Sequence, residues 1–349
     1  MKLATSRDGK RDGQLLVVSR DLREAIPAAS VAPTMLHAIE NWSRARGALQ
    51  ALSDELNAGR VEGALTFDPT RCTAPLTRAP RRIDALGFVH RGRLIETALR
   101  VEPIPDIETV PLMVHGASDV FASATERLMP FGSGWSLDFG AGVAIVVDDV
   151  PAGIRPRDAI AHIRLLMLAN DVGASAYGER RVRAEFGALL DRLAMSFAPV
   201  AVTPDELGDA WQDGRVRLPI RVQYNGMHFG EPHGGDMSFS FGDLVAHAAR
   251  LRGLCAGTVV TSGPFSSVSP HVAGTASIAE RRAMETIKSG KPTTQFMQPG
   301  DCVRIEMLDA GGRSVFGAIE QELRESERAS SAGRHRAGAL DRAFGARRP

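Results

Sequence analysis

The sequence has little cysteine, few aromatic residues and no long apolar run, and each shortage excludes a class of protein. Its three cysteines, Cys72, Cys255 and Cys302, are odd in number and far apart, so they match neither a zinc motif nor a disulfide framework. We expect buried free thiols in a reducing compartment. Aromatic side chains make up only 5% of the chain, which is too few to suggest a surface that stacks nucleic-acid bases.

The charges are balanced and the apolar segments are short. The chain has 42 lysine and arginine residues against 41 aspartate and glutamate residues, and a net charge of +1 gives no basic footprint for nucleic acid. An apolar run such as Val143–Val147 is too short to span a membrane, and the N-terminal segment has no secretion-signal core. We therefore predict a cytoplasmic protein with no nucleic-acid and no membrane partner.

The 349 residues are enough for two domains, and the sequence pattern divides into three parts. Residues 1–75 are predicted to form a small N-terminal domain, with a strand at 13–19 and a helix over 34–56. Residues 76–321 contain many short apolar runs separated by turn residues, which are typical of strands. Residues 322–349 are rich in arginine, alanine, glycine and serine without apolar periodicity, which predicts a disordered tail.

Within the middle part, two segments have apolar residues at helical spacing. They cover 157–167 and 241–252, and each is predicted to form an amphipathic helix. Because strands outnumber helices, the chain is predicted to have a β-dominated α+β fold. The sequence contains no P-loop, dinucleotide-binding fingerprint or nucleophile elbow.

Two segments carry the clearest signature. Trp135–Val147 reads WSLDFGAGVAIVV, and Leu165–Val172 reads LLMLANDV. Further characteristic blocks accompany them, in order along the chain, at 1–5, 12–22, 203–211, 225–230, 236–247, 277–287, 296–307 and 315–320. Together these blocks resemble the bacterial, two-domain branch of the fumarylacetoacetate hydrolase family. The resemblance implies a mixed β-sheet roll preceded by a small N-terminal domain, and assembly as a homodimer.

The resemblance also implies a chemistry. Members of this family hydrolyse carbon–carbon bonds in acylpyruvates and related 2,4-diketo acids, including intermediates of aromatic amino acid catabolism, and some decarboxylate or isomerise instead. The implied cofactor is Mg²⁺ or Ca²⁺, which chelates the dioxo group and stabilises the departing enolate. A histidine oriented by a glutamate would activate water as a general base.

Carried over residue by residue, the metal site of the family is incomplete in this sequence. Asp84 and Asp171 match two metal-binding aspartates, but glycine stands at positions 140 and 142, where the family has two glutamates. Side chains at i and i+2 of a strand share one face, so Asp138 is the nearest carboxylate that could act as a displaced ligand. We therefore expect Mg²⁺ or Ca²⁺ to bind weakly or not at all.

The other site positions also differ from the family pattern. The family histidine falls on Arg91, whereas a shift of one residue would make His90 the base and would turn its ring to the opposite face of a strand. Glu280 matches the glutamate that orients the base, and Arg192 stands where the family has a substrate-binding lysine. The candidate catalytic residues are therefore Glu280 and His90, and the candidate substrate-binding residues are Arg91 and Arg192.

These residues leave three functions open. In the first hypothesis, the chain is a divergent family member that binds a small dicarbonyl or carboxylate ligand and has reduced or lost metal-dependent activity. Alternatively, it is an active hydrolase, decarboxylase or isomerase with a rearranged or metal-free site, or a non-catalytic partner of an active homologue. The altered positions Gly140, Gly142 and Arg91 lie in two separate segments but belong to one site, so we favour the first hypothesis.

Overall fold

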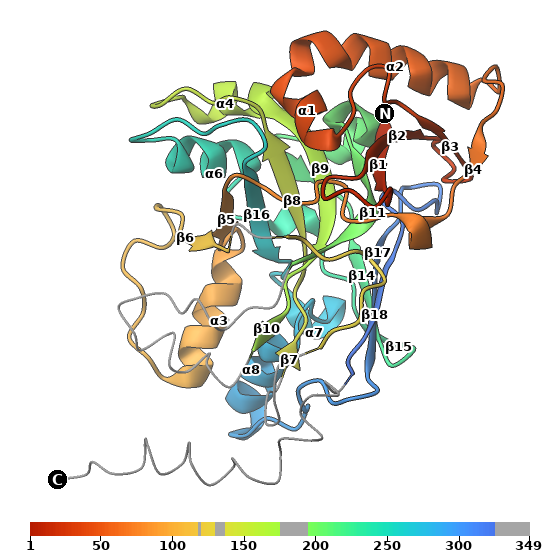
Figure 1. Ribbon diagram of the computed structural model, residues 1–349. Helices are drawn as coiled ribbons and strands as arrows, with labels where there is room; N and C mark the ends of the chain where they lie inside the picture. Colours follow the sequence, from red (N-terminus) through yellow and green to blue (C-terminus); the bar gives the residue numbers. More distant parts are fainter. Residues whose placement is uncertain (118–119, 130–136, 175–194, 325–349) are drawn as a thin grey trace, which may run out of the picture.

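A computed structural model of the protein describes residues 1–117, 120–129, 137–174 and 195–324. In this structure a large sheet runs through the middle of the molecule, with helices on both sides and a smaller sheet beside it (Figure 1). The greater part of the predicted tail, from residue 325 onward, lies outside the described residues.

The large sheet has ten strands and is mixed. β5 runs parallel to β16, and every other neighbouring pair in this sheet is antiparallel. Because β1 pairs with β11, the N-terminal strands belong to the same sheet as the strands that follow. In spatial order the strands are β4 (Leu65–Thr66), β3 (Glu24–Pro27), β2 (Gln14–Val18), β1 (Lys2–Ser6), β11 (Ser196–Val202), β9 (Ile163–Asn170), β8 (Ala141–Val147), β16 (Val259–Pro264), β5 (Arg82–Ala85) and β6 (Met113–Gly116).

The smaller sheet is antiparallel and has four strands. Its order is β15 (Met227–Gly230), β14 (Ile220–Tyr224), β17 (Cys302–Met307) and β18 (Ile319–Glu322). Two short ribbons complete the strands: β7 (Leu137–Asp138) with β10 (Gly173–Ala174), and β12 (Trp211–Gln212) with β13 (Arg215–Val216).

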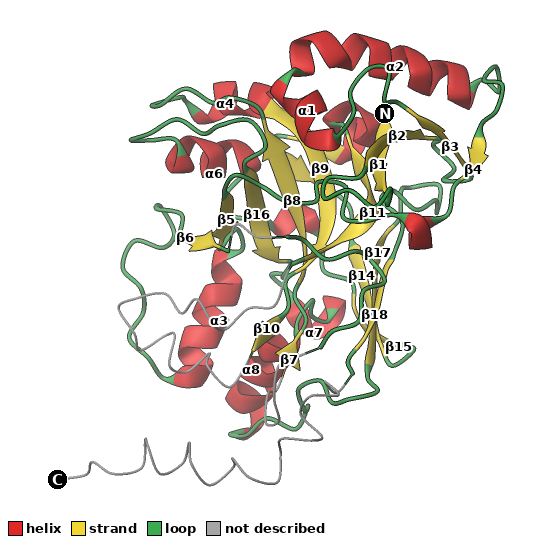
Figure 2. Ribbon diagram, viewed as in Figure 1, coloured by secondary structure: helices red, strands yellow, loops and turns green. Residues whose placement is uncertain are grey.

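The central strands of the large sheet are buried on both faces because they send alternate apolar side chains into two cores. In β8, Val143 and Ile145 belong to one core, whereas Ala144 and Val146 belong to the other. Helices α1 (Met35–Glu40) and α2 (Trp42–Asn57) cover the second core; α6 (Phe241–Ala248) and the smaller sheet pack on the first (Figure 2). Strands buried on both sides read as continuous apolar runs, as β8, β9 and β11 do.

The remaining helices among the described residues are short, and α8 begins at a polar cap. They are α3 (Val89–Leu99), α4 (Pro156–Ala159), α7 (Pro270–Ala273) and α8 (Ile278–Ser289). The Ser277 hydroxyl accepts the hydrogen bond from the backbone N–H of Glu280 at the start of α8, and Gly290 ends that helix at a φ of 80°. Single turns of 3₁₀ helix lie at Pro69–Arg71, Ile160–His162 and Gly234–Asp236, and a longer one at Pro204–Ala210.

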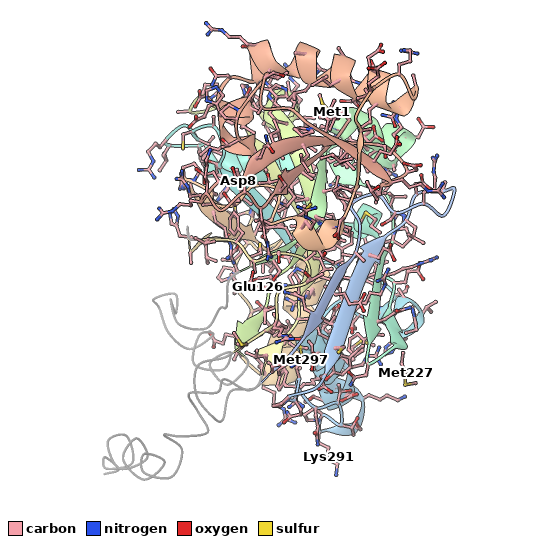
Figure 3. All side chains as sticks on the ribbon, turned by 45° about the vertical axis from the view of Figure 1, so that its right-hand side comes forward. Met1, Asp8, Glu126, Met227, Lys291 and Met297 are labelled. Atoms are coloured by element: carbon pink, nitrogen blue, oxygen red, sulfur yellow. The ribbon has the colours of Figure 1, made fainter. Side chains whose placement is uncertain are left out.

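The N-terminal residues are anchored in the interior. Met1 is buried, and the Lys2 Nζ donates to the backbone oxygens of Ser314 (3.0 Å) and Val315 (2.7 Å). In Figure 3, Met1 lies beneath the helix at the top of the molecule, while Met227 and Lys291 lie at its far end. One end of the chain is therefore fastened to a loop more than three hundred residues away in sequence.

One predicted helix is wrong. Residues 157–167 do not form a single helix: α4 and a 3₁₀ turn end at His162, and β9 begins at Ile163. Between the neighbours β8 and β11, both faces of β9 are covered by apolar side chains, so a run of apolar residues there suits a strand as well as a helix. The apparent helical spacing was a by-product of that run.

Most other predicted elements are confirmed with shifted ends. β2 lies within the predicted strand 13–19, and α6 begins at the predicted residue but ends at Ala248. The predicted helix 34–56 is two helices, because the chain turns at Asn41. The β-dominated α+β class is confirmed, and no described helix is long and apolar enough to cross a membrane.

The cysteine prediction holds only in part. All three cysteines are free thiols, but only Cys72 is buried, whereas Cys255 and Cys302 are exposed. Burial raises the pKa of the Cys72 thiol to about 12, so this side chain stays protonated and behaves as a small apolar group.

Candidate active site

The candidate site lies where several strands of the large sheet end and two helices begin. The start of β8 lies between the 262–266 segment and the residues that lead into α8, since the Phe265 N–H donates to the Ala141 carbonyl and the Ala141 N–H donates to the Ala276 carbonyl. Helix α3 packs against α8 on the same side (Figure 1).

Asp84 and Asp171, the two predicted metal aspartates, are brought together by an arginine. The Arg82 guanidinium donates from Nε to Asp84 Oδ1 (2.8 Å) and from Nη2 to Asp84 Oδ2 (2.7 Å). The same Nη2 lies 3.3 Å from Asp171 Oδ1. The Arg82 side chain is 2% exposed, and the two aspartates are 11% and 8% exposed. A buried cation thus joins both carboxylates.

Arg82 fits because its cross-strand neighbour has no side chain. Arg82 on β5 faces Gly116 on β6, and a Cβ added at position 116 would lie 2.6 Å from Arg82 Nε and 2.8 Å from its Cγ and Cδ. Cβ atoms do not tolerate such distances, so any larger residue at this position would displace the arginine.

Gly140 and Gly142, where the sequence resemblance predicts two glutamates, lie in tightly packed backbone. A Cβ at position 140 would lie 2.8 Å from the Asp171 carbonyl oxygen and 3.0 Å from Pro264 Cγ, and one at position 142 would collide with the Gly263 carbonyl oxygen. The pairing of β16 with β8 shifts register between Thr261 and Pro264, which pushes this backbone toward β8. Strand β8 therefore offers no ligand and no room for one at these positions.

Asp138, the predicted displaced ligand, is bonded to the start of a helix. Its two carboxylate oxygens accept hydrogen bonds from the backbone N–H groups of Ile278 (2.6 Å) and Ala279 (2.9 Å), in the first turn of α8. Those N–H groups have no partner within the helix, and a negative charge there is favourable to the helix dipole. Asp138 thereby fixes the end of the helix that carries Glu280.

Glu280 and Arg91 form a second buried charged group. Glu280 is fully buried and accepts from the Ser266 hydroxyl, while its Oε2 has no hydrogen-bond partner. Arg91 Nε lies 3.9 Å from that Oε2, and Arg91 Nη2 donates to Ser277 Oγ (3.2 Å). Burial raises the pKa of the Glu280 carboxyl, although the charge of Arg91 opposes the shift. A carboxyl held in this way can keep a proton at a higher pH than usual.

His90 lies at the start of α3, edge-on to Phe88 with the ring centres 5.9 Å apart. Its Nε2 is buried without a hydrogen-bond partner. Burial lowers the pKa of His90, with the Ser266 backbone acting in the opposite direction, so the ring is neutral over a wider pH range. A neutral imidazole has the lone pair that a base requires.

The structure gathers most predicted site residues but not all. Arg192 lies outside the described residues. Ser266, Ser277, Arg82 and Gly116 were not predicted, although the Arg-x-Asp spacing of 82 and 84 along one strand is a signal for an ion pair on one face. Within the described ranges, no group of three or more histidine, cysteine, aspartate or glutamate side chains could hold a metal ion.

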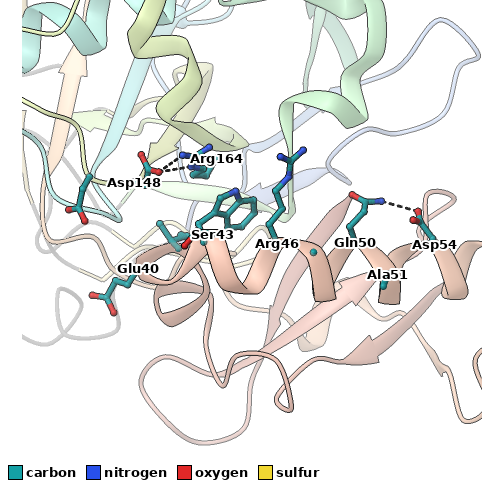
Figure 4. Close-up of a pocket in the computed structure, with 12 residues that line it drawn as sticks. Glu40, Ser43, Arg46, Gln50, Ala51, Asp54, Asp148 and Arg164 are labelled. Atoms are coloured by element: carbon teal, nitrogen blue, oxygen red, sulfur yellow. Dashed lines mark hydrogen bonds and ion pairs between the residues drawn. The ribbon is translucent and has the colours of Figure 1, made fainter.

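A separate cleft of about 780 Å³ lies between α2 and the connection from β8 to β9 (Figure 4). Trp42, Arg46 and Gln50 line its helix side, and Asp148, paired with Arg164, lines the other. None of the candidate site residues that the structure describes borders it. The cleft mixes charges of both signs, which does not indicate a ligand class.

The described residues form a two-part fold built on a large mixed sheet, with buried carboxylate–arginine groups near the ends of its strands. Two family models match the chain: fumarylacetoacetase N-terminal domain 2 over residues 1–78, and the fumarylacetoacetate (FAA) hydrolase C-terminal domain over residues 84–324. The chain therefore belongs to the fumarylacetoacetate hydrolase family, as the sequence motifs predicted. A comparison with curated proteins gives no match.

Solved structures share the fold at low sequence identity. A protein described as HpcE from Mycobacterium smegmatis is 16% identical, with a TM-score of 0.65 over 94% of this chain and all of that one. The fumarylacetoacetate hydrolase of Exiguobacterium antarcticum is 17% identical, with a TM-score of 0.62 over 93% of this chain and all of that one. A maleylpyruvate hydrolase from Sphingobium sp. SYK-6, solved with manganese(II) and pyruvate, is 14% identical, with a TM-score of 0.59 over 94% of this chain and all of that one.

Within the described ranges, the residues at the site do not fit a divalent ion of the kind found with that relative. A hard cation such as Mg²⁺ or Mn²⁺ needs about six oxygen ligands, several from the protein or its substrate. Here the two matching aspartates bind an arginine, Asp138 caps a helix, and positions 140 and 142 supply no oxygen-bearing side chain.

Proposed function

We propose that this chain has lost the metal-dependent hydrolysis of its family and that the residues around Arg91 bind a small carboxylate or dicarbonyl compound. The observation that carries the proposal is the backbone around Gly140 and Gly142, which leaves no space for a side chain. Loss of the two ligands is thus built into the packing of β8 against the register shift in β16.

Arg91 supports the ligand class. Its guanidinium is largely buried, with Nη2 on Ser277 and Nε without a hydrogen-bond partner. A planar guanidinium presents paired donors that match a carboxylate, which a histidine at this position would not. A keto acid such as pyruvate carries both a carboxylate and a carbonyl oxygen for such donors.

One observation favours a second candidate, a metal-free enzyme. Glu280 is a buried carboxyl with an unpartnered oxygen and a raised pKa, and such groups are typical of general acids. In this alternative Glu280 would hold and deliver a proton, with Arg91 stabilising negative charge on the reacting oxygen.

The test combines turnover and binding. We expect no hydrolysis of an acylpyruvate with Mg²⁺, Mn²⁺ or Ca²⁺, and calorimetric binding of pyruvate or oxalate that Arg91→Met weakens by at least about tenfold, the equivalent of one charged hydrogen bond. The exposed Arg23→Met, whose partner Asp21 is also exposed, is the matched control. Metal-stimulated hydrolysis would refute the proposal. Turnover that persists in chelator and disappears in Glu280→Gln would establish the second candidate instead.

A further inference from the structure

We infer that the Arg82 guanidinium is a built-in cation that occupies the place of a divalent ion between Asp84 and Asp171, and that its removal would turn this carboxylate pair into a divalent-cation site. The inference deepens the proposed function and rests on it for the premise that the native chain works without metal. The proposed function concerns the ligand of Arg91, whereas this inference concerns the cation between Asp84 and Asp171.

The contacts show that the positive charge of Arg82 lies against both carboxylates, where a bound metal ion would otherwise lie. Two of its nitrogens form a bidentate pair with Asp84, and one of them also reaches Asp171, 89 residues further along the chain. Two carboxylates that are each about nine-tenths buried repel one another and lose hydration, so they need a positive charge between them.

The surrounding residues are matched to an arginine. Gly116, directly across from Arg82, leaves space for the side chain of Arg82 from Cγ to Nε. In the strand on the other side of β5, Thr261 pairs with Asp84, and its hydroxyl lies 3.5 Å from Asp84 Oδ1. These neighbours fix the Asp84 carboxylate on the same face as the guanidinium.

The same carboxylates suit a metal ion once the arginine is removed. Mg²⁺ and Mn²⁺ accept one or two carboxylates and complete their coordination with water, which the vacated side-chain volume would admit. Such a site would have modest affinity because β8 still contributes no ligand.

The experiment measures the melting temperature of the full chain with and without Mg²⁺ or Mn²⁺. Arg82→Ala is expected to melt below the native protein and to regain about 3 °C or more in about 10 mM cation, as mass action predicts for a millimolar site. The native protein is expected to show no such rise. The Arg78→Ala variant is the matched control, because Arg78 forms the same bidentate pair with Asp12 (2.8 and 2.7 Å) at the surface; it should show no rise.

A second variant guards against misfolding. Arg82→Gln retains much of the side-chain volume without the charge, and it should show the same cation-dependent rise; adding Asp171→Asn to it should abolish that rise. A folded Arg82→Gln without any response to cations would overturn the inference, as would a native protein stabilised by cation through Asp171. These readouts are independent of turnover, so chelator-resistant hydrolysis would refute the proposed function and leave this inference intact.

Discussion

At the level of single residues, the carboxylates that the sequence suggests as metal ligands are present, but they contact other groups of the protein. Asp138 keeps the carboxylate that made it a candidate ligand, but both of its oxygens accept from backbone N–H groups of α8. Asp84 and Asp171 keep theirs and bind Arg82. The sequence alone identifies the carboxylates; only the fold reveals the groups that they contact.

The role of Asp138 as a cap predicts a stability effect. Asp138→Ala removes two hydrogen bonds from the start of α8 and should lower the free energy of unfolding by about 1–2 kcal/mol, the usual value for a lost N-terminal cap. Chemical denaturation checks this. Asp8→Ala, which removes one exposed turn contact with the Lys10 N–H, is the control and should change stability by less than about 0.5 kcal/mol. Equal effects of the two substitutions would count against the capping role.

At the scale of elements, the junction of β8 with β16 decides which side chains the site can have. The register shift between Thr261 and Pro264 brings the Gly263 carbonyl over Gly142, and Ser262 Oγ accepts from the Val143 N–H (3.1 Å). Irregularities of this kind bend a strand and redirect its neighbours, and they are common beside active sites. Here the irregularity closes the strand face on which the sequence resemblance predicted two metal ligands.

Gly142→Ala tests that packing. We expect a loss of about 1–3 kcal/mol in the free energy of unfolding, because the added methyl group must push the Gly263 carbonyl aside. Gly47→Ala is the opposite control: Gly47 lies exposed in α2 with nothing near its Cβ, so alanine should stabilise the helix by about 0.5–1 kcal/mol. A Gly142→Ala variant as stable as the native chain would show that the junction yields readily.

Secondary structure was predictable from the sequence where the period was unambiguous. The apolar positions of α6 lie on one face next to polar ones, so its helical period is visible, and the Ser240–Asp243 capping box marks its start. β9 has buried residues on both sides, and a continuous apolar run carries no period that separates strand from helix. The Asn41 turn between α1 and α2 likewise left no break in the apolar spacing.

At the scale of the whole molecule, the chain is closed by contacts between its distant parts. Lys2 is buried and donates to the loop at Ser314 and Val315, so the first strand and the last part of the core are held together. The contacts of the site were less predictable from the sequence, because they too join distant parts of the chain. Motif order identified the family, but the contacts of Asp171 with Arg82, of Asp138 with the start of α8 and of Glu280 with Arg91 join segments that lie far apart in sequence.

Lys2 predicts a pH dependence of stability. Burial lowers its pKa to about 8 from an ordinary 10.5, so between those values the unfolded chain binds more protons than the folded one, and stability rises with pH. Lys2→Met removes this titration. Urea unfolding at about pH 7 and about pH 10 should therefore show that the native protein gains stability relative to the variant on going to the higher pH. A constant difference between the two proteins would contradict a buried, titrating Lys2.

The pairing of β1 with β11 and of β5 with β16 also fixes when the chain can finish folding. Lys2 pairs with Val202, and Asp84 pairs with Thr261. Each of these early strands can therefore pair fully only after some two hundred further residues have been synthesised. Contacts this distant in sequence form slowly, and an unpaired strand edge invites the wrong partner in the meantime. During synthesis one edge of β1 therefore stays unpaired until β11 has emerged, and mispairing at that edge is a risk for the N-terminal part over this interval.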